Sequence, residues 1–227
     1  MKFLTEIADF FLPRFCASCN TKLIIEENFV CHQCLSKIHE IDGSQITVLY
    51  LRKFGETKIV SDFYVLYLFE KDKEVQRIIH QLKYNHKFLL GKYLGENLGY
   101  AISEAVNKWQ IDMIVPVPLH HVKRAERGYN QSYYITKGLN KVLNIPVNQR
   151  IIKRKRFTQS QTKLDRKARE QNIKGAFALR RNSLIVGKNI LLVDDVVTTG
   201  ATVRECGRLL LRNGANKIFV AAVAIAE

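Results

Sequence analysis

Short apolar runs alternate along this chain with longer segments in which apolar residues recur every three or four positions. The runs at residues 112–118, 190–193 and 217–224 predict buried strands, whereas residues 73–82, 88–109, 129–143 and 201–213 have helical spacing. Strands that alternate with helices form a mostly parallel sheet with right-handed crossovers. The pattern therefore predicts an α/β fold, a parallel sheet flanked by helices.

Two segments on either side of Gly55 carry a different pattern. Residues 47–54 and 58–69 are rich in β-branched and aromatic types, which predicts two strands that can pair as a hairpin. Further on, Gly91, Gly95 and Gly99 repeat on one face of the predicted helix, so we expect them to allow close packing against the sheet.

The N-terminal part of the chain predicts a separate small module. Apolar positions between residues 3 and 11 fit one face of a short helix that Pro13 ends, and Glu6 and Asp9 argue against a signal peptide. We expect residues 1–45 to form this helix and a metal module, and residues 46–227 to form the larger domain. With no apolar run near ~20 residues, the sequence predicts no membrane span and a cytoplasmic protein.

Four of the five cysteines form two C-x-x-C pairs: Cys16, Cys19, Cys31 and Cys34. Two such pairs allow four thiolates to converge on one structural Zn²⁺ ion. Disulfides are the weaker interpretation without a secretory signal, and a redox motif would show one pair rather than two. We expect His32 to be an exposed neighbour and Cys206 a small buried residue.

The formal net charge is +15, from 36 Lys and Arg against 21 Asp and Glu. Such an excess suits phosphate-rich partners, either a polyphosphorylated small molecule or a nucleic acid. A solvated basic surface without a specific partner has the same composition, so charge alone does not choose between these alternatives.

The segment at residues 190–202, ILLVDDVVTTGAT, carries the most specific chemistry. Its apolar strand delivers Asp194 and Asp195 to the carboxyl edge of the sheet, where open α/β sheets bind ligands. Residues 198–202 then offer hydroxyls and backbone N–H groups at a helix N-terminus, which suits a phosphate. Adjacent carboxylates suit ribose hydroxyls beside Mg²⁺. A response-regulator acidic pocket lacks the T-T-G-A-T loop, and no Walker P-loop sequence occurs.

Residues 193–202 resemble the signature with which type I phosphoribosyltransferases bind phosphoribosyl diphosphate (PRPP). The resemblance implies a type I phosphoribosyltransferase-like fold in which Asp194 and Asp195 hold the ribose hydroxyls with Mg²⁺. It assigns the 5-phosphate to the loop that follows them. The PRPP-binding residues so implied are Asp194, Asp195, Val197, Thr198, Thr199, Gly200, Ala201 and Thr202.

Segments elsewhere extend the resemblance to nearly the whole chain. FLPRFCASC with the second CxxC, the triplet at residues 82–84, IVPVPLHHVKRAERGYNQS at residues 114–132 and the motif at residues 158–177 are similar to the ComF family of competence-associated proteins. This family implies a role in DNA uptake during natural transformation, with single-stranded DNA as a partner. The zinc module would contact DNA or dock a helicase, and nothing in the sequence separates these.

Two further loops receive roles from the same resemblance. The loop after residues 112–118, with Leu119 and His120, corresponds to the pyrophosphate loop and should share the sheet edge with Asp194. The basic stretch at residues 150–169 resembles the mobile loop that closes over the diphosphate, or it can bind a nucleic-acid backbone. The residues assigned to this flexible loop are Gln161, Arg166 and Arg169.

Whether the protein is an enzyme is left open by the sequence. In the hypoxanthine-guanine enzymes of the phosphoribosyltransferase family an acidic residue occupies the position of Thr198, and threonine does not act as a base near neutral pH. No base-recognition hood is visible. The sequence therefore predicts PRPP binding in a DNA-uptake protein, with phosphoribosyl transfer to an unidentified nitrogen acceptor as the alternative.

Overall fold

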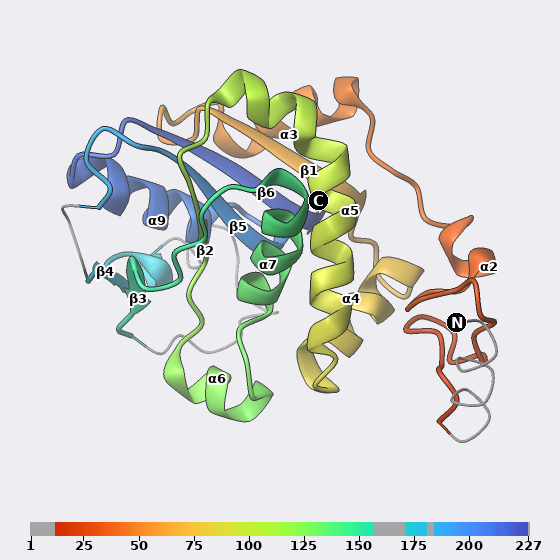
Figure 1. Ribbon diagram of the computed structural model, residues 1–227. Helices are drawn as coiled ribbons and strands as arrows, with labels where there is room; N and C mark the ends of the chain where they lie inside the picture. Colours follow the sequence, from red (N-terminus) through yellow and green to blue (C-terminus); the bar gives the residue numbers. More distant parts are fainter. Residues whose placement is uncertain (1–11, 157–170, 181–183, 227) are drawn as a thin grey trace.

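The structure, a computed structural model, describes residues 12–156, 171–180 and 184–226 (Figure 1). Its centre is a four-stranded sheet in the order β1-β6-β5-β2, comprising β1 (Asp62–Leu68), β6 (Lys217–Ile225), β5 (Asn189–Val197) and β2 (Met113–Pro116). All three strand pairs are parallel. The predicted α/β fold with a parallel sheet is therefore confirmed.

The central strands β5 and β6 are apolar on both sides because helices cover both faces of the sheet. One face packs against α4 (Glu74–Tyr84), α5 (Phe88–Trp109) and α7 (Gln131–Leu143), and the other against α3 (Gly43–Phe54) and α9 (Ala201–Arg212). Leu191 and Val193 of β5 enter the first core, whereas Ile190 and Leu192 enter the second. This alternation is the period-2 geometry of a strand.

Helices α5 and α7 approach each other closely through glycines. A Cβ added at Gly95 would lie 2.0 Å from the carbonyl oxygen of Ile135, and one added at Gly138 would lie 2.0 Å from that of Lys92. Real side chains do not fit at such distances, so only glycine allows this contact. The predicted close packing of the glycine face is correct, but its partner is α7 rather than the sheet.

The predicted strand at residues 47–54 is wrong, because this segment belongs to helix α3. Asp42 begins the helix with a capping box: its side chain accepts a hydrogen bond from the Gln45 N–H, and the Gln45 side chain accepts one from the Asp42 N–H. Leu49 and Phe54 then turn toward the core. Capping and helical burial outweigh the β-branched composition here, while residues 58–69 do contain strand β1.

Beyond β2 the chain forms a short helix, α6 (His121–Arg127), before α7. Residues 146–148 add a short parallel bridge at the free edge of β2, through Val147 opposite Ile114. The antiparallel hairpin of β3 (Ile152–Arg154) and β4 (Phe177–Leu179) follows. Most of the predicted mobile loop falls between these two strands in the sequence and is outside the described residues. The predicted N-terminal helix is also outside the described residues.

The cysteine module and helix α2 (His32–Leu35) lie at one end of the molecule (Figure 1). Their buried residues, among them Cys16, Leu23 and Val30, belong to the same hydrophobic core as α4 and α5. Arg77 of α4 donates a hydrogen bond to the hydroxyl of Ser18, and Phe29 packs on Tyr93 of α5. Within the described ranges, none of the helices combines the length and apolar character that crossing a membrane requires.

Candidate functional site

Strand β5 carries its two aspartates to the carboxyl edge of the sheet. Ser132, at the start of α7, donates a hydrogen bond to Oδ1 of Asp194 at 3.1 Å, and the backbone N–H of Asp195 donates to the same oxygen at 2.9 Å. Lys83, at the end of α4, lies with its Nζ 3.1 Å from Asp195 Oδ2. The two carboxylates therefore have different partners although they are adjacent in sequence.

The two aspartates also differ in their electrostatics. Burial raises the pKa of Asp194 to about 7, and the negative charge of Asp195 acts in the same direction. Because like charges this close disfavour double ionisation, Asp194 holds its proton up to near-neutral pH. A ligand that brings a divalent cation would favour ionisation of both. Carboxylate oxygens are the ligands that Mg²⁺ prefers, so this donor set fits a Mg²⁺ ion.

The Thr/Gly loop encloses a small cavity directly beside Asp194. The cavity measures about 30 Å³ and is lined by Asp194, Val196, Val197, Thr198, Gly200, Ala201, Thr202 and Val203. Gly200 has φ of 75°, and an added Cβ would lie 2.9 Å from the ring of Phe54, so this position requires glycine. The Thr199 hydroxyl accepts a hydrogen bond from the Ala201 N–H, where α9 begins. Backbone donors at this helix start suit a phosphate.

The loop after β2 lies at the same edge, as the sequence predicts. Val117 N–H donates to the carbonyl of Val193 at 2.8 Å, which places the following residues next to the aspartates. Leu119 is partly buried, and His120 is 4% exposed and begins α6. Burial lowers the pKa of His120, and the charge on His121 adds to this, so its imidazole is neutral near pH 7.

A group of cations surrounds this edge, and of these the sequence analysis placed only Arg154 near the ligand, as part of the basic stretch at residues 150–169. Lys83 comes from the end of α4, Lys123 and Arg127 from α6, and Arg154 from β3. Burial lowers the pKa of Lys123, and the charges of Arg127, Arg154 and Lys83 lower it further, which records how close the four cations lie. The only sequence signal for Lys83 is its place in the triplet at residues 82–84.

The same edge contains a buried side-chain amide, that of Gln131, which could donate a hydrogen bond to a ligand. Arg127 donates a hydrogen bond to Gln131 Oε1 at 3.1 Å, and its guanidinium lies 5.4 Å from the centre of the exposed Tyr84 ring. Gln131 is 2% exposed, and its Nε2 has no hydrogen-bond partner among the described residues. A buried amide donor of this kind is costly unless it is paired.

The three residues predicted for the flexible loop, Gln161, Arg166 and Arg169, lie outside the described residues. The structure therefore places the aspartates, the Thr/Gly loop and the loop of Leu119 and His120 at one edge. It adds Ser132 and the four cations to them.

The four predicted metal ligands form a cluster. The Sγ atoms of Cys16, Cys19, Cys31 and Cys34 all lie within 4.8 Å of one another, and those of Cys19 and Cys31 are 3.7 Å apart. The edge of a tetrahedron with Zn–S bonds of ~2.3 Å is ~3.8 Å, whereas a disulfide is far shorter. None of the five cysteines, all of which lie in the described ranges, forms a disulfide. The cluster therefore fits a tetrahedral metal ion.

Backbone donors and one buried carboxylate fix the geometry of this cluster. The N–H groups of Ser18 and Cys31 point at the sulfur of Cys16, at 3.4 and 3.3 Å. Glu27 accepts hydrogen bonds from the N–H groups of Ile24 and His32, which lowers the pKa of its carboxyl. His32 itself is exposed and Cys206 is buried far from the cluster, as the sequence predicts.

Comparison with known proteins gives consistent findings. The family described as "Phosphoribosyl transferase domain" matches residues 129–226. The chain is 30% identical over 232 residues to Competence protein F of Haemophilus influenzae, which covers 92% of this chain and 96% of that protein. It is 36% identical over 146 residues to DNA utilization protein YhgH of Escherichia coli and spans 63% of that protein's length. It is 25% identical over 206 residues to Competence protein ComFC of Bacillus subtilis.

Proposed function

This chain belongs to the ComF family of competence proteins, and on that premise we propose that it acts in DNA uptake and binds Mg²⁺–PRPP. The PRPP assignment rests on one observation: Asp194 and Asp195 lie beside the cavity of the Thr/Gly loop at one edge of the sheet. The surrounding cations complete a site for a ligand with both hydroxyls and phosphates.

In this proposal each part of PRPP meets a matching group. Asp194 and Asp195 accept hydrogen bonds from the ribose hydroxyls and hold Mg²⁺, which bridges them to the diphosphate. The N–H groups and hydroxyls of residues 198–202 take the 5-phosphate. The diphosphate extends toward Leu119 and His120, where Lys123 and Arg127 offset its charge.

Isothermal titration calorimetry with Mg²⁺–PRPP tests this assignment. We expect one site per chain in the wild type, and a loss of affinity of at least ~100-fold in Asp194→Asn/Asp195→Asn because two charged ligands of Mg²⁺ disappear. Glu104→Gln, which removes an exposed carboxylate on α5, is the control and should bind like the wild type. The PRPP assignment fails if the wild type produces no binding signal or if the double variant binds equally well.

Phosphoribosyl transfer is a second candidate, and the exposed ring of Tyr84 favours it. Tyr84 follows Lys83, whose ammonium pairs with Asp195, and Arg127 lies against the ring. A planar acceptor can stack on this aromatic surface beside the ribose position. Pyrophosphate release across a panel of nucleobases and amines, with Tyr84→Ala as the variant, separates an enzyme from a protein that only binds PRPP.

For single-stranded DNA we propose the β3–β4 hairpin as a contact. Lys153 and Lys155 are exposed on it, whereas Arg154 faces the site and Arg156 donates to backbone carbonyls of residues 172 and 174. Each lost phosphate contact lowers the slope of log affinity against log salt by ~0.7 for single strands. We therefore expect Lys153→Gln/Lys155→Gln to lower the slope by ~1.4.

The matched control removes the same charge elsewhere. Lys108→Gln/Lys141→Gln changes two exposed lysines that pair with Glu104 and Glu96, and it should leave the slope unchanged. Equal slopes for the hairpin variant and the control would remove the hairpin from the DNA-binding surface.

We also propose that the metal of the cysteine cluster is a structural Zn²⁺ ion within a module of residues 1–45, with residues 46–227 as the phosphoribosyltransferase-like domain. Four thiolates leave no open coordination position, which is typical of structural rather than catalytic zinc. Reduced cysteines persist in the cytoplasm, where we place the protein. Docking of a competence helicase by this module is part of the same proposal.

A further inference from the structure

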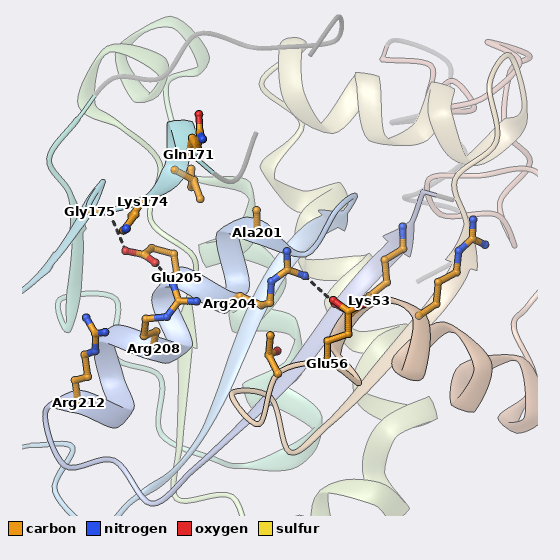
Figure 2. Close-up of a pocket in the computed structure, with 13 residues that line it drawn as sticks. Lys53, Glu56, Gln171, Lys174, Gly175, Ala201, Arg204, Glu205, Arg208 and Arg212 are labelled. Carbon is orange, nitrogen blue, oxygen red and sulfur yellow. Dashed lines mark hydrogen bonds and ion pairs between the residues drawn. The ribbon is translucent and has the colours of Figure 1, made fainter. Parts of the chain in front are cut away.

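A second and larger cavity, which we call the cationic pocket, reaches Ala201 at the start of α9 (Figure 2). It has a volume of about 640 Å³ and three walls: the C-terminal end of α3, the outer face of α9, and residues 171–175. Its charged lining consists of six basic and two acidic side chains: Arg52, Lys53, Lys174, Arg204, Arg208, Arg212, Glu56 and Glu205.

Helical periodicity gathers the charges of α9 on one wall. Arg204, Arg208 and Arg212 recur every four residues and line the pocket together with Glu205, while Cys206 on the opposite side is in the core. Arg52 and Lys53 of α3 and Lys174 of the third wall add further basic side chains around α9.

Buried Arg204 joins this wall to α3. It is 6% exposed and donates hydrogen bonds to the carbonyl oxygen of Lys53 at 2.7 Å and to that of Thr199 at 2.9 Å. The guanidinium thus fixes the end of α3 against the start of α9. The pocket is consequently a built cavity rather than a chance gap between two helices.

The third wall is tied down from both sides. Glu205 accepts hydrogen bonds from the Gly175 N–H at 2.8 Å and from Arg208, so its charge is already engaged (Figure 2). Arg156 holds the same segment from outside by donating to the carbonyls of Asn172 and Lys174. The remaining lining is strongly positive, and repulsion among its cations favours an anionic occupant.

We propose that the cationic pocket binds an oligophosphate, either free or as the phosphate chain of a nucleoside triphosphate. The cations converge on one hollow from three walls, which suits a compact multiply charged anion, and the volume lies within the range of small-molecule sites. A single-stranded nucleic acid instead needs cations along a track with aromatic rings for stacking. The described residues that line the pocket include no aromatic side chain.

Calorimetric titration of the full-length protein with tripolyphosphate, in 150 mM NaCl without Mg²⁺, tests the proposal. The pocket variant is Arg52→Gln/Arg212→Gln, which removes two exposed cations from opposite walls without touching buried Arg204. We expect one bound tripolyphosphate in the wild type and a loss of about tenfold or more in this variant. Lys108→Gln/Lys141→Gln, with the same net charge, should stay within about twofold.

A further variant separates the pocket from the PRPP site. Lys123→Gln/Arg127→Gln removes cations at the sheet edge and should also leave tripolyphosphate affinity within about twofold. The same titration with ATP distinguishes the sources, since equal affinity identifies the phosphate chain as the recognised group and tighter binding shows that the nucleoside contributes.

Three results would overturn the proposal. The first is equal weakening in the pocket variant and the charge-matched control, which would mean nonspecific attraction. The second is loss of binding in Lys123→Gln/Arg127→Gln alone, which would place the anion at the sheet edge. The third is a pocket variant that weakens binding of a single-stranded oligonucleotide but not of tripolyphosphate, which would make the pocket a nucleic-acid contact.

Discussion

Replacement of Asp194 by asparagine should stabilise the ligand-free protein, and increasingly so as the pH rises. Asparagine keeps the shape and the oxygen that accepts from Ser132 and from the Asp195 N–H. It removes a carboxyl whose pKa in the folded protein is about 7, raised first by burial and then by the charge of Asp195.

The size of the effect follows from the two states of this carboxyl. An unfolded chain releases the proton near pH ~3.9, so between about pH 4 and pH 7 the folded state binds a proton that the unfolded state has lost. The contribution of Asp194 to wild-type stability therefore falls with rising pH across this window and is constant above it. A difference of about three pKa units corresponds to at most ~4 kcal/mol, and we expect a gain of ~2–4 kcal/mol for Asp194→Asn at pH 8.

Urea unfolding of the zinc-loaded protein without Mg²⁺ or PRPP measures this gain at pH 5.5 and pH 8. More acidic conditions are avoided because the thiolates of a zinc site take up protons there. The stability difference between Asp194→Asn and wild type should roughly double between the two pH values. Glu104→Gln, an exposed carboxylate, should give a difference near zero at both. A gain that does not depend on pH, or a loss at pH 8, would refute the assignment of the raised pKa to Asp194.

Three other predictions concern the ligand, the metal and the packing. Mg²⁺–PRPP affinity should rise about fivefold between pH 6 and pH 7 and level off above pH ~8 in calorimetric titrations, because binding requires the ionised form of Asp194. Cys34→Ser should lower the bound zinc measured by atomic emission and lower the thermal unfolding midpoint, since the module lacks a core of its own. Gly138→Ala should destabilise the protein by roughly 3 kcal/mol in urea unfolding because its Cβ would collide with the Lys92 carbonyl, whereas Gly43→Ala, which meets nothing within 4 Å, should not.

Most of the sheet could be predicted from the sequence because its strands are short, well-delimited apolar runs. The strands at residues 112–118, 190–193 and 217–224 were predictable because each is buried on both faces and has no polar interruption before its end. Helix α3 was missed because its composition at residues 47–54 favours a strand. Its capping residues, Asp42 and Gln45, precede the segment and were the signal that distinguishes a helix.

Some residues of the candidate site could be predicted from the sequence and others could not. Asp194, Asp195 and the Thr/Gly loop are contiguous in sequence, so their chemistry could be predicted together. Lys83 and Arg154 belong to segments far from Asp194 in sequence, and only the packing of α4 and the β3–β4 hairpin brings them to the sheet edge. No local pattern encodes such a meeting of distant segments.

Helix α4 contacts the cysteine module at one end and the proposed PRPP site at the other. Arg77 near its start contacts Ser18 of the cysteine module, and Lys83 at its end pairs with Asp195. A shift of this helix on metal loss would therefore move the ammonium group that faces the ribose position. Thermodynamic reciprocity then requires that PRPP change the affinity for zinc by the same factor by which zinc changes the affinity for PRPP. Through this helix, loss of zinc from the cysteine module would change how much PRPP is bound at the sheet edge.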